Sequence, residues 1–98
     1  MTKEEKNILM KTMADNLPIL RSKLNLSQEE LAVLLGVTRQ TISSFESNQR
    51  KMTWSVFLAL ILIFFRNDPT KRLLVALNIY TPALNDFLNI SKNNEGGK

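Results

Sequence analysis

Residues 26–46, LSQEELAVLLGVTRQTISSFE, contain two short apolar-periodic segments separated by a glycine, and they constrain the fold more than any other stretch. Ser27 followed by Glu30 forms a capping box, in which the hydroxyl and the carboxylate satisfy free backbone amides at a helix start. The first helix therefore begins near Gln28. Gly36 tolerates the left-handed backbone just past a helix end. The stretch thus predicts two helices joined by a tight turn.

The two predicted helices present different surfaces. Thr38 is a good N-cap for the second helix, and Ile42 and Phe45 give that helix a narrow apolar stripe. The first helix directs apolar side chains into the core, whereas the second offers hydrogen-bonding groups to solvent. We expect inward positions at Leu31, Ala32, Leu34 and Leu35, and outward positions at Arg39, Gln40, Thr41, Ser43, Ser44 and Ser47.

The pattern SQEELAxxLGVTRQTISxFE resembles the helix-turn-helix of the phage repressor and Cro family, the Xre-type bacterial regulators. The resemblance extends more loosely over about residues 14–66 and does not cover the C-terminal part of the chain. It implies a compact helical bundle whose third helix enters the DNA major groove, usually as a symmetric dimer. The matching residues are Gln28, Ala32, Gly36, Val37, Thr38, Gln40, Ile42, Ser43 and Glu46.

Length and composition indicate one domain without catalytic chemistry. The chain has 98 residues, of which 44% are hydrophobic, enough for a single core. It contains no cysteine and no histidine, so thiolate and imidazole ligands and the commonest general base are absent. Its acidic residues are scattered rather than paired, and we expect neither an enzyme nor a metal or cofactor. The net charge of +4 suits a polyanionic partner but is modest.

The N-terminal segment, residues 3–24, repeats apolar residues every three or four positions and predicts one amphipathic helix or two. Pro18 removes a backbone amide, so we expect either a kink or a new helix capped by Asn16. Arg21 and Lys23 are assigned to the solvated outer side. No signal peptide is visible, and a cytoplasmic location is expected.

Residues 54–65, WSVFLALILIFF, follow a cap at Thr53 and are apolar on almost every side. This run is too short to span a bilayer, which needs about 17 to 25 residues, so it must be buried in protein. Either the C-terminal helices or a second copy of the chain covers it, and we expect both. The interface candidates are Phe57, Ile61, Phe64, Phe65, Leu84, Phe87 and Leu88.

Two proline-containing starts predict short C-terminal helices. Asp68 with Pro69 begins one that runs through Leu77, and Thr81 with Pro82 begins the last. The predicted fold is an all-α bundle of five to six helices around the helix-turn-helix. Its parts are a DNA-binding core at 1–66 with the motif at 27–46, an extension at 67–90 that packs on the core or the dimer partner, and a disordered tail at 91–98.

The resemblance also implies roles for single residues. Arg39, Gln40 and Ser44 match base-reading positions, and Ser43 reaches either a base or the backbone; arginine pairs well with guanine and glutamine with adenine. The adjacent Arg50 and Lys51 would neutralise phosphates. Glu46, acidic beside DNA, is expected to hold a basic or amide group instead. The complete set of predicted phosphate contacts is Gln28, Thr38, Thr41, Asn48, Arg50 and Lys51, although capping alone explains Thr38.

The sequence therefore predicts a cytoplasmic transcriptional regulator, a repressor that binds a palindromic or near-palindromic double-stranded operator as a homodimer. No effector pocket and no membrane association are expected. One alternative stays open. In it the chain is an antitoxin-like interaction subunit whose apolar helix 54–65 and C-terminal helices bind a second polypeptide, and DNA binding is secondary.

Overall fold

The computed structural model describes residues 1–90, which form helices and connecting turns without a β-strand. The helices are α1 (Lys3–Lys23), α2 (Gln28–Leu35), α3 (Arg39–Glu46), α4 (Trp54–Phe65), α5 (Asp68–Ala76) and α6 (Pro82–Leu88). The predicted all-α fold class is confirmed. The predicted disordered tail at 91–98 lies outside the described residues.

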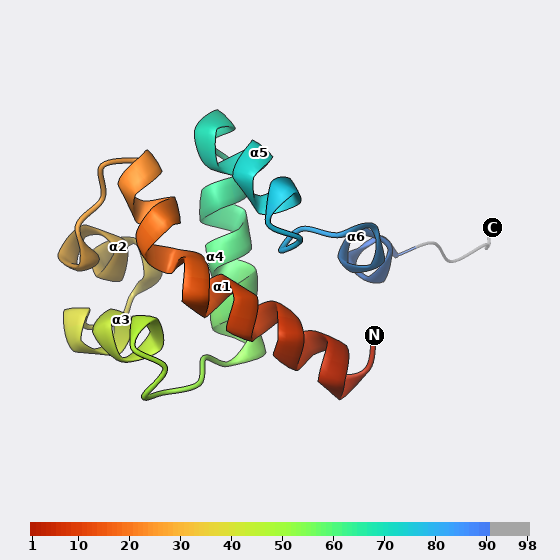
Figure 1. Cartoon of the computed structure of the whole chain (residues 1–98), viewed down its shortest axis with the longest axis horizontal. Helices are drawn as coiled ribbons and strands as arrows, with labels where there is room; N and C mark the ends of the chain where they lie inside the picture. Colours follow the sequence, from red (N-terminus) through yellow and green to blue (C-terminus); the bar gives the residue numbers. More distant parts are fainter. Residues whose placement is uncertain (91–98) are drawn as a thin grey trace.

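The helices are arranged around α1 and α4 (Figure 1). α2 and α3 pack together at one end, α1 packs against α3, α4 and α5, and α4 also contacts α2 and α5. α6 lies near the N-terminus of α1, at the end away from α2 and α3 (Figure 1). The core is built from fully buried side chains of all six helices, among them Leu17, Leu31, Ile42, Phe57, Phe64, Leu74 and Leu84.

α1 is one continuous helix from Lys3 to Lys23 with Pro18 inside it, so of the two expected alternatives the new helix capped by Asn16 is wrong. Asn16 is not a cap, because its amide donates 2.8 Å to the carbonyl of Thr12. Pro18 is exposed while Leu17 and Leu20 are fully buried. Burial of these two leucines against the bundle keeps the chain helical across the missing proline amide.

The helix starts and the turn of the motif are confirmed. Ser27 and Glu30 form the capping box of α2, Gly36 has φ of 78°, and the Thr38 hydroxyl accepts from the amide of Thr41. The two hydrogen bonds with Ser27 lower the pKa of the Glu30 carboxyl. The inward assignment of Leu34 is wrong, since this side chain is 59% exposed. The buried face of α2 is centred between Leu31 and Ala32, and Leu34 projects from its edge.

Three helices end in an asparagine with left-handed backbone, a feature that the sequence interpretation missed. Asn25, Asn48 and Asn78 have φ of 54°, 59° and 58°. After each, the next amide bonds back across the turn, as Gln49 does to the carbonyl of Ser44 at 2.9 Å. Asparagine is the residue that most often replaces glycine at this position. These turns set the direction in which the chain leaves α1, α3 and α5.

The junction between α4 and α5 differs from its prediction. Asn67 rather than Asp68 is the N-cap of α5, and its side chain donates to the carbonyl of Ile63 instead of capping. The fully buried Thr70 donates 2.6 Å to the carbonyl of Phe64, which satisfies a free carbonyl at the end of α4. The caps at Thr53 and Thr81 are confirmed.

α6 is attached to the bundle by one buried side chain and an aromatic cluster. Leu84 is fully buried, and the ring of Phe87 lies edge-on to Trp54 with a centroid distance of 6.3 Å. The ammonium of Lys6 is 5.1 Å from the centroids of both rings, a cation–π arrangement. None of the helices within residues 1–90 combines the length and the apolar character needed to cross a bilayer.

Candidate nucleic-acid interface

α3 carries the polar side chains predicted to read DNA. Arg39 and Gln40, in the first turn of this helix, are exposed, whereas Thr41, Ser43 and Ser44 are half-buried. Ile42 and Phe45 are buried on the opposite side, so the helix is fixed by its apolar stripe while its outer face stays open. Among the predicted base readers, Arg39 and Gln40 are the most accessible.

Thr38 and Thr41 form a small hydroxyl pair at the start of α3. The amide of Thr41 donates 3.1 Å to the Thr38 hydroxyl, and the two hydroxyl oxygens are 3.0 Å apart. The backbone contact accounts for Thr38 as an N-cap. Thr38 itself is exposed, so its hydroxyl is accessible beside the outer face of α3.

A chain of polar contacts connects α1, both ends of α3 and the start of α2. Arg21 donates to both carboxylate oxygens of Glu46, at 2.7 and 3.0 Å, and to the carbonyl of Leu26 at 2.9 Å. Gln28 donates 2.9 Å to the same carboxylate and accepts 3.2 Å from the Arg39 guanidinium. Each group in the series therefore orients the next one. The orientation of Arg39, an exposed base-reading candidate, therefore depends on the largely buried ion pair between Arg21 and Glu46.

Glu46 is confirmed as the partner of a basic group and an amide, and the assignment of Arg21 to the solvated surface is wrong. The side chains of Arg21 and Glu46 are only 17% and 9% exposed. The bidentate hydrogen bonding to Glu46 raises the pKa of Arg21 above its ordinary value, against the opposing effect of burial. Glu46 neutralises Arg21 and holds Gln28, which keeps its carboxylate inside the domain.

The loop after α3 places three of the predicted phosphate contacts. Arg50 and Lys51 are exposed, the Arg50 amide bonds to the Ser44 carbonyl at 3.2 Å, and its guanidinium is 3.5 Å from the Thr41 hydroxyl. This distance is at the limit for a hydrogen bond, but it places the cation beside α3. The loop thus brings positive charge next to the candidate reading helix.

Asn48 has a structural role that the sequence interpretation did not foresee. Its backbone is left-handed, and its amide donates 3.0 Å to a carboxylate oxygen of Asp15 on α1. The bond from Asn48, and the ion pair with Lys11, lower the pKa of the Asp15 carboxyl. These contacts explain Asn48 without DNA, and we therefore leave its side chain out of the proposed interface.

The apolar interface candidates divide between the core and the surface. Phe57, Phe64 and Leu84 are fully buried within a single chain, so a second copy cannot reach them. Ile61 is 6% exposed, Phe65 is half-buried, and Phe87 and Leu88 are 41% and 42% exposed. The sequence interpretation missed Leu62, which is 68% exposed on α4. Because residues 54–65 are almost all apolar, the sequence does not show which of them are buried and which are exposed.

The fold and the exposed face of α3 define a helix-turn-helix protein of the DNA-binding class. Residues 19–60, which include α2, the turn and α3, match the helix-turn-helix family. The match over these residues supports an Xre-type, lambda-repressor-like helix-turn-helix regulator. This family is a DNA-binding one and not an enzyme family. No curated protein and no solved structure matches the chain.

Proposed function

We propose that the protein is a repressor that binds a two-fold operator as a homodimer and reads each half-site with α3. The observation that supports this proposal best is the exposed first turn of α3, where Arg39 is oriented by Gln28 and Gln40 is free to reach a base. A glutamine amide matches the donor and acceptor edge of adenine, and a guanidinium matches guanine. Repression follows from occupancy, because the bound dimer excludes other proteins from the operator.

The remaining polar groups around α3 would position the protein on the phosphate backbone. Gln28 is the first residue of α2, where free amides and the helix dipole favour an anion. The Thr38 and Thr41 hydroxyls lie together with the Arg50 guanidinium, which is 3.5 Å from the Thr41 hydroxyl, and Lys51 follows Arg50 in the chain. Ser43 and Ser44, half-buried, would contact the edge of the site. Two copies would place their α3 helices in successive major grooves about 34 Å apart.

The Gln40→Ala variant tests the base-reading assignment. We expect its affinity for the cognate operator to fall by about tenfold or more per half-site, because one good bidentate contact is worth about 1–3 kcal/mol of discrimination. Its affinity for a random duplex of equal length should stay unchanged. Fluorescence anisotropy on the upstream DNA of the gene and on the random duplex measures both values.

Gln49→Ala is the matched control, since Gln49 is an exposed glutamine of the following loop with no assigned base contact. It should leave discrimination intact. Equal losses on cognate and random DNA for Gln40→Ala would exclude Gln40 as a base reader. A wild-type protein that binds its operator less than about a thousandfold tighter than random DNA would argue against a sequence-specific regulator.

A further inference from the structure

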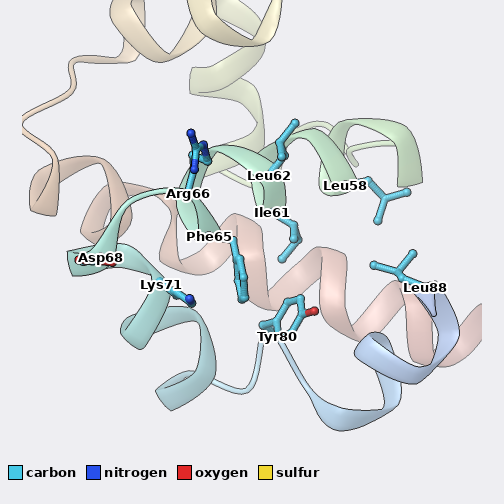
Figure 2. Close-up of a pocket in the computed structure, with 9 residues that line it drawn as sticks. All are labelled: Leu58, Ile61, Leu62, Phe65, Arg66, Asp68, Lys71, Tyr80 and Leu88. Atoms are coloured by element: carbon cyan, nitrogen blue, oxygen red, sulfur yellow. The ribbon is translucent and has the colours of Figure 1, made fainter.

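An open groove of about 620 Å³ lies between α4 and the chain that leads into and ends α6 (Figure 2). Its apolar lining consists of Leu58, Ile61, Leu62, Phe65, Tyr80 and Leu88. The rings of Phe65 and Tyr80 contact each other with centroids 4.6 Å apart and form one wall. In Figure 2, α1 passes behind the side chains of Phe65 and Tyr80, between α4 and α6. Of the lining residues Ile61 also belongs to the buried core, and none lies on α3 or on the loop that follows it.

Within residues 1–90 no side chain fills the groove. An apolar groove bordered by exposed leucines gains free energy when apolar groups from another molecule cover it.

The same face carries a ridge that complements the groove. Leu58 and Leu62 are one helical turn apart on α4, and Leu62 is 68% exposed and projects away from Tyr80 and Leu88 (Figure 2). Residues four apart form the ridges that pack into grooves on a facing helix. In a two-fold symmetric pair the same patch serves both subunits, so each ridge can enter the groove of the other copy.

We propose that this face is a self-complementary interface in which Leu62 of each copy enters the α4–α6 groove of a second copy. The proposal rests on the homodimer proposed above and specifies the surface that forms it. In this interface the residues that contact the second copy are Leu58, Ile61, Leu62, Phe65 and Leu88. Phe57, Phe64 and Leu84 remain in the core of each copy.

The charges at one end of the groove fit a second copy. Arg66, Asp68 and Lys71 all line this end, so both signs are present on a single patch. Within residues 1–90 neither Arg66 nor Asp68 has an ion-pair partner, whereas the Lys71 ammonium lies 4.8 Å from the centroid of Phe65. Two-fold symmetry can bring Asp68 of one copy to Arg66 of the other, twice in one interface. A surface that carries both positive and negative charges can therefore pair with the same surface of a second copy.

Leu62→Glu tests the interface without disturbing the core, because the side chain is already exposed. We expect the dimer dissociation constant to rise by about a hundredfold or more, since the dimer would bury two unpaired carboxylates. Light scattering over a wide range of protein concentrations measures the mass of the intact chain. Ile8→Glu is the matched control. Ile8 is a similarly exposed aliphatic residue, at 65%, on α1 outside the groove, and its variant should dimerise like the wild type.

Charge reversal provides a second measurement. Arg66→Glu and Asp68→Arg should each weaken their own homodimer by repulsion, whereas an equimolar mixture of the two variants should form a heterodimer with both pairs restored. Native mass spectrometry distinguishes the three dimers. A mixture that forms no heterodimer in excess of the homodimers would overturn the proposed pairing of Arg66 with Asp68.

These experiments also separate a failure of the groove interface from a failure of the proposed homodimeric repressor. A Leu62→Glu protein that dimerises as tightly as the wild type would overturn the groove interface while the homodimer on DNA stands. A wild-type protein that stays monomeric at every concentration and on its operator would overturn both. A monomer that gains mass only with a different polypeptide in the groove would also overturn the self-interface, and it would favour the interaction-subunit alternative.

Discussion

The Glu46→Ala variant is expected to lose about 3 kcal/mol of its free energy of unfolding. Removal of one partner from a buried ion pair costs about 3–5 kcal/mol because the remaining charge is left uncompensated, and this pair is slightly exposed, which favours the lower limit. The loss would include the hydrogen bond from Gln28, which has no other acceptor among its contacts in residues 1–90. Urea denaturation followed by circular dichroism measures the change.

The Lys11→Ala variant provides the comparison within the same protein. Lys11 and Asp15 also form an ion pair, with N–O distance 3.0 Å, but their side chains are 64% and 44% exposed. Solvent-exposed pairs contribute about 0–1 kcal/mol, so this variant should unfold nearly like the wild type. Similar losses for Glu46→Ala and Lys11→Ala would show that the Arg21–Glu46 pair has no special role in stability.

A double-mutant cycle separates the pair from its surroundings. Because Arg21→Ala removes the charge that Glu46→Ala leaves unpaired, the double variant should be destabilised by much less than the sum of the two single variants. The stability of the pair also bears on DNA binding, since Glu46 orients Gln28 and Gln28 accepts from Arg39. We expect the Glu46→Ala protein to bind its operator more weakly even where it is fully folded.

Local signals in the sequence predicted most of the secondary structure. The capping box at Ser27, the left-handed Gly36 and the threonine caps each depend on residues within one turn of helix, so they can be identified without a tertiary structure. The predicted cap at Asp68 is off by one residue, because the backbone carbonyl of Asn67, and no side chain, accepts from the amides of Thr70 and Lys71. The same reasoning missed Asn25, Asn48 and Asn78 because asparagine occurs in many other contexts.

Contacts between distant residues were not predictable in the same way. The sequence indicated that Glu46 needs a basic or amide partner, but its main partner, Arg21, lies 25 positions earlier on another helix. Periodicity placed Arg21 on the outer side of α1, which is correct for an isolated helix and wrong once α3 packs beside it. The apolar run 54–65 likewise required burial, yet only the bundle separates buried Phe64 from exposed Leu62.

The Arg50→Ala/Lys51→Ala variant is expected to bind every duplex more weakly and with less dependence on salt. Its two lost cations would remove two phosphate contacts per chain, or about four per dimer, and each contact contributes about 0.9 to the slope of log affinity against log salt. Between about 50 and 200 mM salt, the wild type should therefore lose about a hundredfold more affinity than the variant. Anisotropy titrations with cognate and random duplexes at several salt concentrations measure both slopes.

The Lys3→Ala/Arg72→Ala variant removes the same charge from exposed positions on α1 and α5. If Arg50 and Lys51 act by contacting phosphates, the control variant should keep the wild-type slope of log affinity against log salt. The reason is that the Arg50 guanidinium lies beside Thr41 on α3, whereas Lys3 is at the far end of α1 (Figure 1). Equal flattening in both variants would attribute the effect to net charge alone. A loss on cognate DNA only would instead make the loop a base-reading element, since phosphate contacts carry no sequence information of their own.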